Sequence, residues 1–159
     1  SMLSKSALQL AQELFTQFSS QLVPQSAPFV DICLNLCCNS RQFIADEAEN
    51  VIILIAQESH RYKVLNSFIK GTAHKNSIAR GKAAQCLSIL IEQGPLDDRE
   101  LKAVVQCLVP LVRDNRTETR SAAKETLKLV ADDDRFRDIA KDVCKNSVDY
   151  KELLKSMEI

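Results

Sequence analysis

The residues best suited to chemistry are six cysteines, three of which lie close together at Cys33, Cys37 and Cys38. Thiolates bind zinc and attack electrophiles, but a zinc site needs CxxC pairs or a matched set of Cys and His. The two histidines, His60 and His74, both fall in predicted turns. Each cysteine belongs to an apolar helical pattern. We therefore interpret the cysteines as small buried residues of a reducing compartment, with a metal site, disulfides or a reactive thiol as alternatives.

The other reactive side chains do not form a catalytic arrangement in the sequence. His60 and His74 lie in separate turns, and no Ser/His/Asp or Cys/His set has a supporting context. There is no Gly-rich phosphate loop. Asp97 and Asp98 are better explained as helix caps, because Asp97 and Glu100 have the spacing of a capping box. We predict a protein that is not an enzyme and has no cofactor.

The composition of the 159 residues narrows the class of partner. The chain has 21 Lys and Arg against 21 Asp and Glu, and it has no Trp. A nucleic-acid module would be basic overall and would offer aromatic platforms. No apolar run reaches the roughly 18 residues of a membrane span. Nucleic acid and membranes are therefore not expected as partners.

One helical pattern occurs three times, in residues 43–52, 78–87 and 118–127. Each copy has an alanine, an aliphatic residue four positions later and another apolar residue three further on. The triplets are Ala48, Ile52 and Ile55; Ala83, Leu87 and Leu90; and Ala123, Leu127 and Val130. A period of about 35 to 40 residues is typical of stacked helix pairs that share one core. The pattern predicts an all-α fold, an α-solenoid of stacked antiparallel helix pairs.

The predicted helices form a single domain over residues 1–159. The pairs are 29–38 with 41–58, 61–71 with 77–93, and 97–113 with 117–131, giving repeats at about 27–58, 61–93 and 97–131, and the closing helices are 133–145 and 149–157. In this order of pairs, a further helix at 3–22 is the second half of an earlier, truncated repeat. Its apolar stripe is wide, which indicates that something packed on it in the parent protein. The Ser1-Met2 start resembles a tag remnant, so we expect an excised piece of a longer protein. Helix 3–22 could then let the piece self-associate.

Turns within pairs fall on one rim of such a solenoid, and turns between pairs fall on the other. The within-pair turns are basic and polar; they carry Arg41, His74, Lys75, Asn76, Arg113 and Arg116, with Arg80 and Arg120 just behind. Two between-pair turns are acidic, at Glu92 to Asp98 and Asp132 to Asp134. A basic rim favours an acidic partner surface. The alternatives are that these turns are only solvated, and that Arg80 and Arg120 brace neighbouring turns.

Three segments carry a resemblance to a known family. Residues 38–48 are similar to the "SNKFIRDEA" segment of TOG domains, His74-Lys75-Asn76 with Arg80 resembles their "HKN...R" turn, and Glu118-Thr119-Arg120 resembles their "ETR" segment. The helix pairs look like HEAT repeats. The likeness covers about residues 27 to 145 and is closest to the Crescerin group, the TOG-array regulators of axonemal microtubules.

The resemblance implies a tubulin- or microtubule-binding module, because TOG domains engage tubulin through within-repeat turns. The residues expected to face tubulin are Arg41, Gln42, His74, Lys75, Asn76, Arg80, Arg116 and Arg120. The resemblance also implies a cytoplasmic, cytoskeletal location, with the cilium or centrosome as the finer expectation. The alternative is a helical-repeat scaffold that binds another protein and does not bind tubulin.

Overall fold

The structure is a computed structural model that describes residues 5–9 and 26–159. Over these residues it contains helices and turns and no strand. The predicted all-α solenoid is confirmed. The helices are α2 (Ser26–Cys37), α3 (Gln42–Glu58), α4 (Arg61–Gly71), α5 (Ser77–Ile91), α6 (Asp98–Leu108), the 3₁₀ helix η2 (Val109–Arg113), α7 (Thr117–Lys128), α8 (Phe136–Val143) and α9 (Ser147–Ser156).

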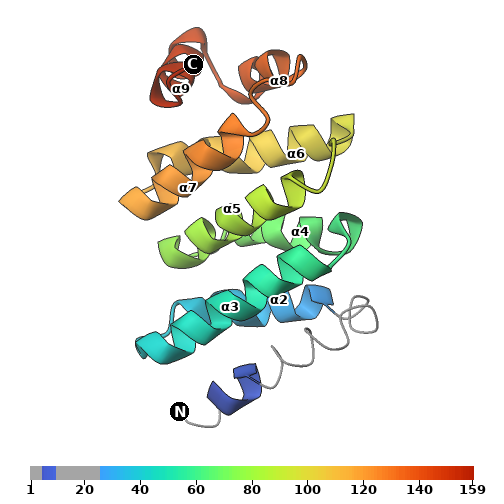
Figure 1. Cartoon of the computed structure of the whole chain (residues 1–159). Helices are drawn as coiled ribbons and strands as arrows, with labels where there is room; N and C mark the ends of the chain where they lie inside the picture. The colour runs from blue at the N-terminus through green and yellow to red at the C-terminus, as the bar shows by residue number, and fades with distance from the viewer. Residues whose placement is uncertain (1–4, 10–25) are drawn as a thin grey trace.

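The helices stack in two layers (Figure 1). Helices α3, α5 and α7 form the near layer, and α2, α4 and α6 lie behind them, with each helix packed on the next of its own layer. The repeated apolar positions lie between the layers: the side chains of Ala48, Ala83 and Ala123 have no exposed surface, and neither do Ile52, Leu87 and Leu127. These small and aliphatic residues let the helices approach closely and form one continuous core.

Glycine marks the closest approach between α5 and α7. A Cβ atom at Gly81 would lie 2.7 Å from Thr119 Oγ1 and 3.3 Å from Thr119 Cα. Real Cβ atoms do not approach other atoms this closely without displacing them. Gly81 is the fifth residue after the N-cap Asn76, and α5 needs glycine at this position because it crosses α7 there.

Some helices begin or end at the capping and stop residues that the sequence indicates, and others do not. Asp97 and Glu100 form the expected capping box, and α6 ends before Pro110 and continues as the 3₁₀ turn η2. Ser77, in contrast, is not the N-cap of α5. Asn76 takes that position and its side chain accepts a hydrogen bond from Ile78 N–H at 2.9 Å. The Ser77 hydroxyl instead points from the second repeat to the third, where it donates a hydrogen bond to Asp114.

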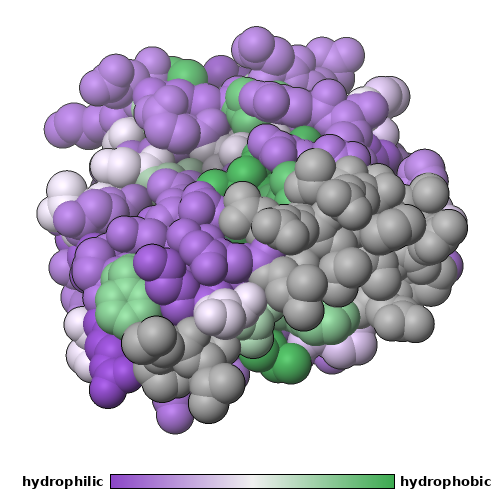
Figure 2. Space-filling view, turned by 60° about the horizontal axis from the view of Figure 1, so that its bottom comes forward, coloured by the Kyte–Doolittle hydropathy of each residue, from purple (hydrophilic) through white to green (hydrophobic). Residues whose placement is uncertain are grey.

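At the N-terminal end of the stack, residues 5–9 are helical, and Leu8 within this segment is buried in the common core. Most of the predicted helix 3–22 lies outside the described residues. Figure 2 brings this end of the molecule forward: its described surface is mainly hydrophilic and is interrupted by separate hydrophobic areas. Ile32 on α2 and Phe43 on α3 are 54% and 42% exposed, and Lys5 Nζ lies 5.6 Å from the centre of the Phe43 ring.

Among residues 5–9 and 26–159, no helix has both the length and the apolar character needed to cross a bilayer. Over the same residues, no group of three or more Cys, His, Asp or Glu side chains is placed to hold a metal ion. The six cysteines are free thiols, and Cys33, Cys37 and Cys86 are buried.

Candidate functional site

We call the three turns 38–41, 72–76 and 114–116, together with the first turn of the helix that follows each, the within-pair rim. It lies at the left of the molecule in Figure 1. The three turns share one hydrogen-bonding pattern. The side chains of Asn39, His74 and Asp114 occupy equivalent positions, and each accepts a hydrogen bond from the backbone N–H two residues later, at 2.9, 3.0 and 3.1 Å. These local bonds fix the backbone of each turn before its helix begins.

Arg80 and Arg120 brace the second and third turns from inside. Arg80 Nη1 donates to the His74 carbonyl at 2.8 Å, and Arg120 Nη1 donates to the Asp114 carbonyl at 2.7 Å. The two arginines are equivalent positions of the repeat, and each reaches back six residues. Their guanidinium groups are therefore engaged within the chain, as the bracing alternative predicts. The first repeat has Ala45 at this position and has no such brace.

Asp114 joins the second repeat to the third. Its carboxylate accepts from Arg80 Nε at 2.7 Å, and it also accepts a hydrogen bond from the Ser77 hydroxyl. Burial by itself would raise the pKa of Asp114, but the hydrogen bonds from Arg80 and Ser77 outweigh it and lower the pKa to about 2. Thr119 adds a second link, because its hydroxyl donates to the Ser77 carbonyl at 2.8 Å. The relative position of these two rim turns is thus set by a buried polar network.

His74 joins the second repeat to the first. Its Nδ1 accepts from Asn76 N–H, so the proton of the neutral ring is on Nε2. Nε2 lies 2.7 Å from Asn35 Oδ1 on α2 and donates to it. His74 and Asn76 were both expected to face tubulin. In this structure the ring of His74 and the side chain of Asn76 are used to hold the turn and to cap α5.

The remaining expected residues point outward from the braced turns. Arg41 and Lys75 are exposed, and within residues 26–159 neither forms a salt bridge. The Arg116 side chain is 41% exposed and lies 3.4 Å from Glu118. Gln42 donates to Asp46 at 2.7 Å on the surface of α3. Arg41, Asn76 and Arg116 are the equivalent N-cap positions of α3, α5 and α7, so the repeat places two arginines on this rim, of which Arg41 is exposed and Arg116 is half-buried.

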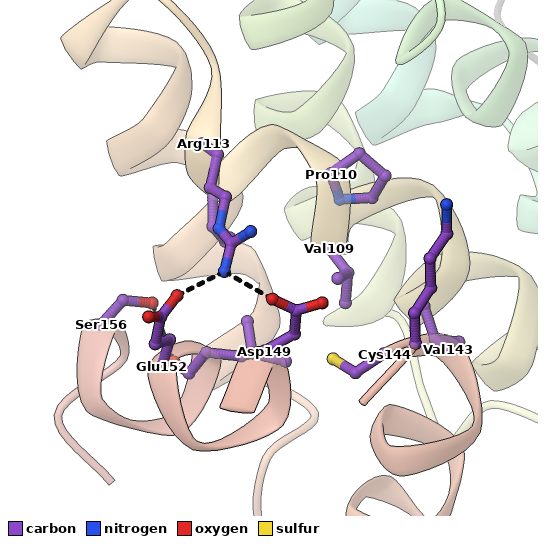
Figure 3. Close-up of a pocket in the computed structure, with 11 residues that line it drawn as sticks. Val109, Pro110, Arg113, Val143, Cys144, Asp149, Glu152 and Ser156 are labelled. Atoms are coloured by element: carbon purple, nitrogen blue, oxygen red, sulfur yellow. Dashed lines mark hydrogen bonds and ion pairs between the residues drawn. The ribbon is translucent and has the colours of Figure 1, made fainter. Parts of the chain in front are cut away.

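Arg113 does not extend the basic rim. Its Nη2 donates to Glu152 at 2.6 Å and to Asp149 at 3.3 Å, both on α9 (Figure 3). These side chains border a cavity of about 490 Å³ between η2 and the α8–α9 connection, with Val109, Pro110 and Cys144 on its wall. The ion pair fastens the closing helices to the third repeat and neutralises the Arg113 charge.

The opposite rim, formed by the turns between pairs, is held by two arginines for which the sequence predicted no structural role. Arg61 donates to the carbonyls of Gly94 and Pro95 at 2.9 and 2.8 Å. Arg135 donates to the carbonyl of Leu96 at 2.9 Å and to Asp98 at 2.6 Å. Arg61 also pairs with Glu100 at 3.2 Å. Asp98 and Glu100 are therefore neutralised inside the chain, and this turn is less acidic than its sequence suggests.

The fold and the rim define a class, the helical-repeat domains in which helix pairs stack and aligned turns form an edge. The sequence profile described as CLASP N terminal matches residues 1–147, and the chain belongs to this family of TOG-like HEAT-repeat domains. The family is linked to microtubule-associated proteins and is not a family of enzymes, which supports a general role in microtubule regulation and association with the cytoskeleton. No curated protein matches the chain.

Proposed function

We propose that this chain is a tubulin-binding module that contacts αβ-tubulin through the within-pair rim. The observation that carries the proposal is the placement of three cations on the aligned turns of successive repeats: Arg41 and Lys75 are exposed, and Arg116 is half-buried with a side chain that is 41% exposed. Cations on a rigid edge suit an acidic protein surface, because the turns that carry them are already fixed by hydrogen bonds and little backbone order is lost on binding.

The eight candidate residues then divide into two roles. Arg41, Lys75 and Arg116 are the contacts, and Gln42 lies beside them on the first turn of α3. His74, Asn76, Arg80 and Arg120 hold the turns in place, since each is engaged by a hydrogen bond within the chain. Loss of a contact should weaken binding with little effect on stability. Loss of a bracing residue should affect both.

Light scattering during size-exclusion chromatography of this chain with αβ-tubulin at low salt tests the proposal. We expect a one-to-one complex for the wild type and separate elution for the variant Lys75→Glu with Arg116→Glu. The matched control is Lys151→Glu with Lys155→Glu, which makes the same change of charge at exposed positions of α9. Equal loss in both variants would show that net charge, and not the rim, determines binding.

A protein-binding scaffold that does not engage tubulin is the second candidate. The exposed apolar side chains of Ile32 and Phe43 at the N-terminal end favour it. In the same experiment it predicts no complex with tubulin and a mass above that of one chain. The likeness to the Crescerin group and the ciliary or centrosomal location rest on the sequence motifs, and we include them only as the finer part of the tubulin proposal.

A further inference from the structure

The layer formed by α4 and α6 has a groove that meets the within-pair rim at one end, where Thr72, Ala73 and Asn115 line it. It runs between α4 and α6, and two hollows of about 310 and 810 Å³ lie along it and share Ile69. Tyr62, Asn66 and Lys70 form the α4 side, and Arg99 and Ala103 line the α6 side. Helices α4 and α6 lie in the layer behind α5 and α7 (Figure 1).

The exposed cations of α4 and α6 have no acidic partner on these two helices; Lys70 and Arg99 line the hollows, and Lys63 and Lys102 are exposed on the same helices. Helix α4 contains no acidic residue, and its exposed cations are Lys63 and Lys70. Helix α6 adds the exposed cations Arg99 and Lys102. The two acidic residues of α6, Asp98 and Glu100, are already paired with Arg135 and Arg61. The cations of the groove are therefore not balanced by acids of the two helices that form it.

The groove also offers apolar surface. Tyr62 is 72% exposed, the most exposed large hydrophobic side chain of the described residues. Lys63 Nζ lies 5.1 Å from the centre of its ring, and the His60 ring stacks on it at 5.8 Å. Leu65 and Ile69 form the floor. An aromatic ring held by neighbours beside an apolar floor can receive one apolar side chain of a partner.

We propose that the groove between α4 and α6 binds a short acidic peptide segment of a partner protein, with one aliphatic residue seated between Tyr62 and Ile69. Its carboxylates pair with Lys63, Lys70, Arg99 and Lys102. Each helix has 11 residues, or about 16 Å of length, which corresponds to about five residues of extended chain. The site adjoins the within-pair rim at the larger hollow, but its centre at Tyr62 and Arg99 lies outside that rim, and it does not depend on tubulin binding.

The probe is a fluorescein-labelled peptide with one leucine between two pairs of glutamates, titrated with the intact chain and followed by fluorescence anisotropy. We expect saturable binding that weakens when serine replaces the leucine. In the variant Lys70→Gln with Arg99→Gln, the affinity should fall by about tenfold, the effect of losing two partly exposed charge contacts. The control Lys151→Gln with Lys155→Gln should bind within about twofold of wild type. Both pairs are exposed, so the unfolding midpoint should not change.

Backbone amide shifts of the ¹⁵N-labelled chain locate the peptide. We expect changes at Tyr62, Ile69 and Ala103, and none at Lys75. The proposal is overturned if the two pairs of variants weaken binding equally, if the serine peptide binds as well as the leucine peptide, or if the shifts map to the within-pair rim. Tighter binding of a five-nucleotide single-stranded DNA would also overturn it, because the groove would then be a nucleic-acid site and not a peptide site.

Discussion

The Asp114 carboxylate accepts a hydrogen bond from Arg80 Nε at 2.7 Å and thereby connects the rim turns of two successive repeats. The Arg80 side chain is 19% exposed and that of Asp114 is 5% exposed, so the pair is mostly shielded from water. Arg80 also holds the carbonyls of His74 and Lys75. A single guanidinium group thus supports the turn that presents Lys75 and ties it to the turn that presents Arg116.

We predict a coupling energy of about 1–3 kcal/mol between Arg80 and Asp114, because a shielded hydrogen bond between charged groups is worth about this much. The measurement is a double-mutant cycle of Arg80→Ala, Asp114→Ala and the double variant by urea unfolding. Additive effects of the two single changes would mean that the ion pair does not hold the turns together.

The same contact predicts a dependence of stability on acid. The pKa of Asp114 is about 2, below its ordinary value of 3.8. A depressed pKa stabilises the folded chain above the unfolded pKa, and that stabilisation is lost as the pH falls from about 3.8 toward about 2. The wild type should therefore lose its advantage over Asp114→Asn in this window and keep it constant at higher pH. Urea unfolding of both proteins between pH 2 and 6 measures the difference, and a constant difference across the whole range would contradict the assignment.

Gly81 provides a test of the packing between α5 and α7. Gly81→Ala should destabilise the chain by about 1–2 kcal/mol, because the clash with Thr119 outweighs the gain of about 1 kcal/mol that alanine brings to a helix. Gln85→Ala, at an exposed position of α5, serves as the control and should have little effect. A gain in stability for Gly81→Ala would show that the helices can move apart at no cost.

The cysteines should react with iodoacetamide in an order set by burial. Burial raises the pKa of Cys33 and Cys37 to about 12 and raises the pKa of Cys86 as well. A buried protonated thiol is a poor nucleophile. We expect Cys38 and Cys144, which are half-buried, to be labelled first when tryptic peptides are followed by mass spectrometry. Early labelling of Cys86 in the folded chain would contradict its place in the core.

The core residues could be predicted from the sequence because the repeated alanine and aliphatic positions recur with a helical period and therefore lie on one face of each helix. Ala48, Ala83 and Ala123 can be aligned from the sequence alone, and their burial follows from that alignment. Helix ends were harder to predict from the sequence. Ser77 and Asn76 are both good N-cap residues, and the choice between them depends on Asp114, which is distant in sequence and receives the Ser77 hydroxyl.

The division of the rim into contacts and braces could not be predicted for the same reason. An arginine in a polar turn looks the same in the sequence whether it faces solvent or a carbonyl. The bracing roles of Arg61 and Arg135 were not predicted because their main partners are backbone carbonyls of residues 94–96, which carry no side-chain signal. The available hint was position, since both arginines lie next to a between-pair turn and one of them follows three aspartates.

The affinity of αβ-tubulin for Lys75→Glu, compared with Lys151→Glu at the same low salt concentration, tests the central claim most directly. Both changes reverse one exposed charge, and only Lys75 lies on the within-pair rim. We predict that Lys75→Glu weakens binding by about tenfold or more while Lys151→Glu stays within about twofold of wild type, with equal unfolding midpoints for all three proteins. Unchanged affinity of Lys75→Glu, or an equal loss in both variants, would contradict the assignment of the rim as the tubulin-binding surface.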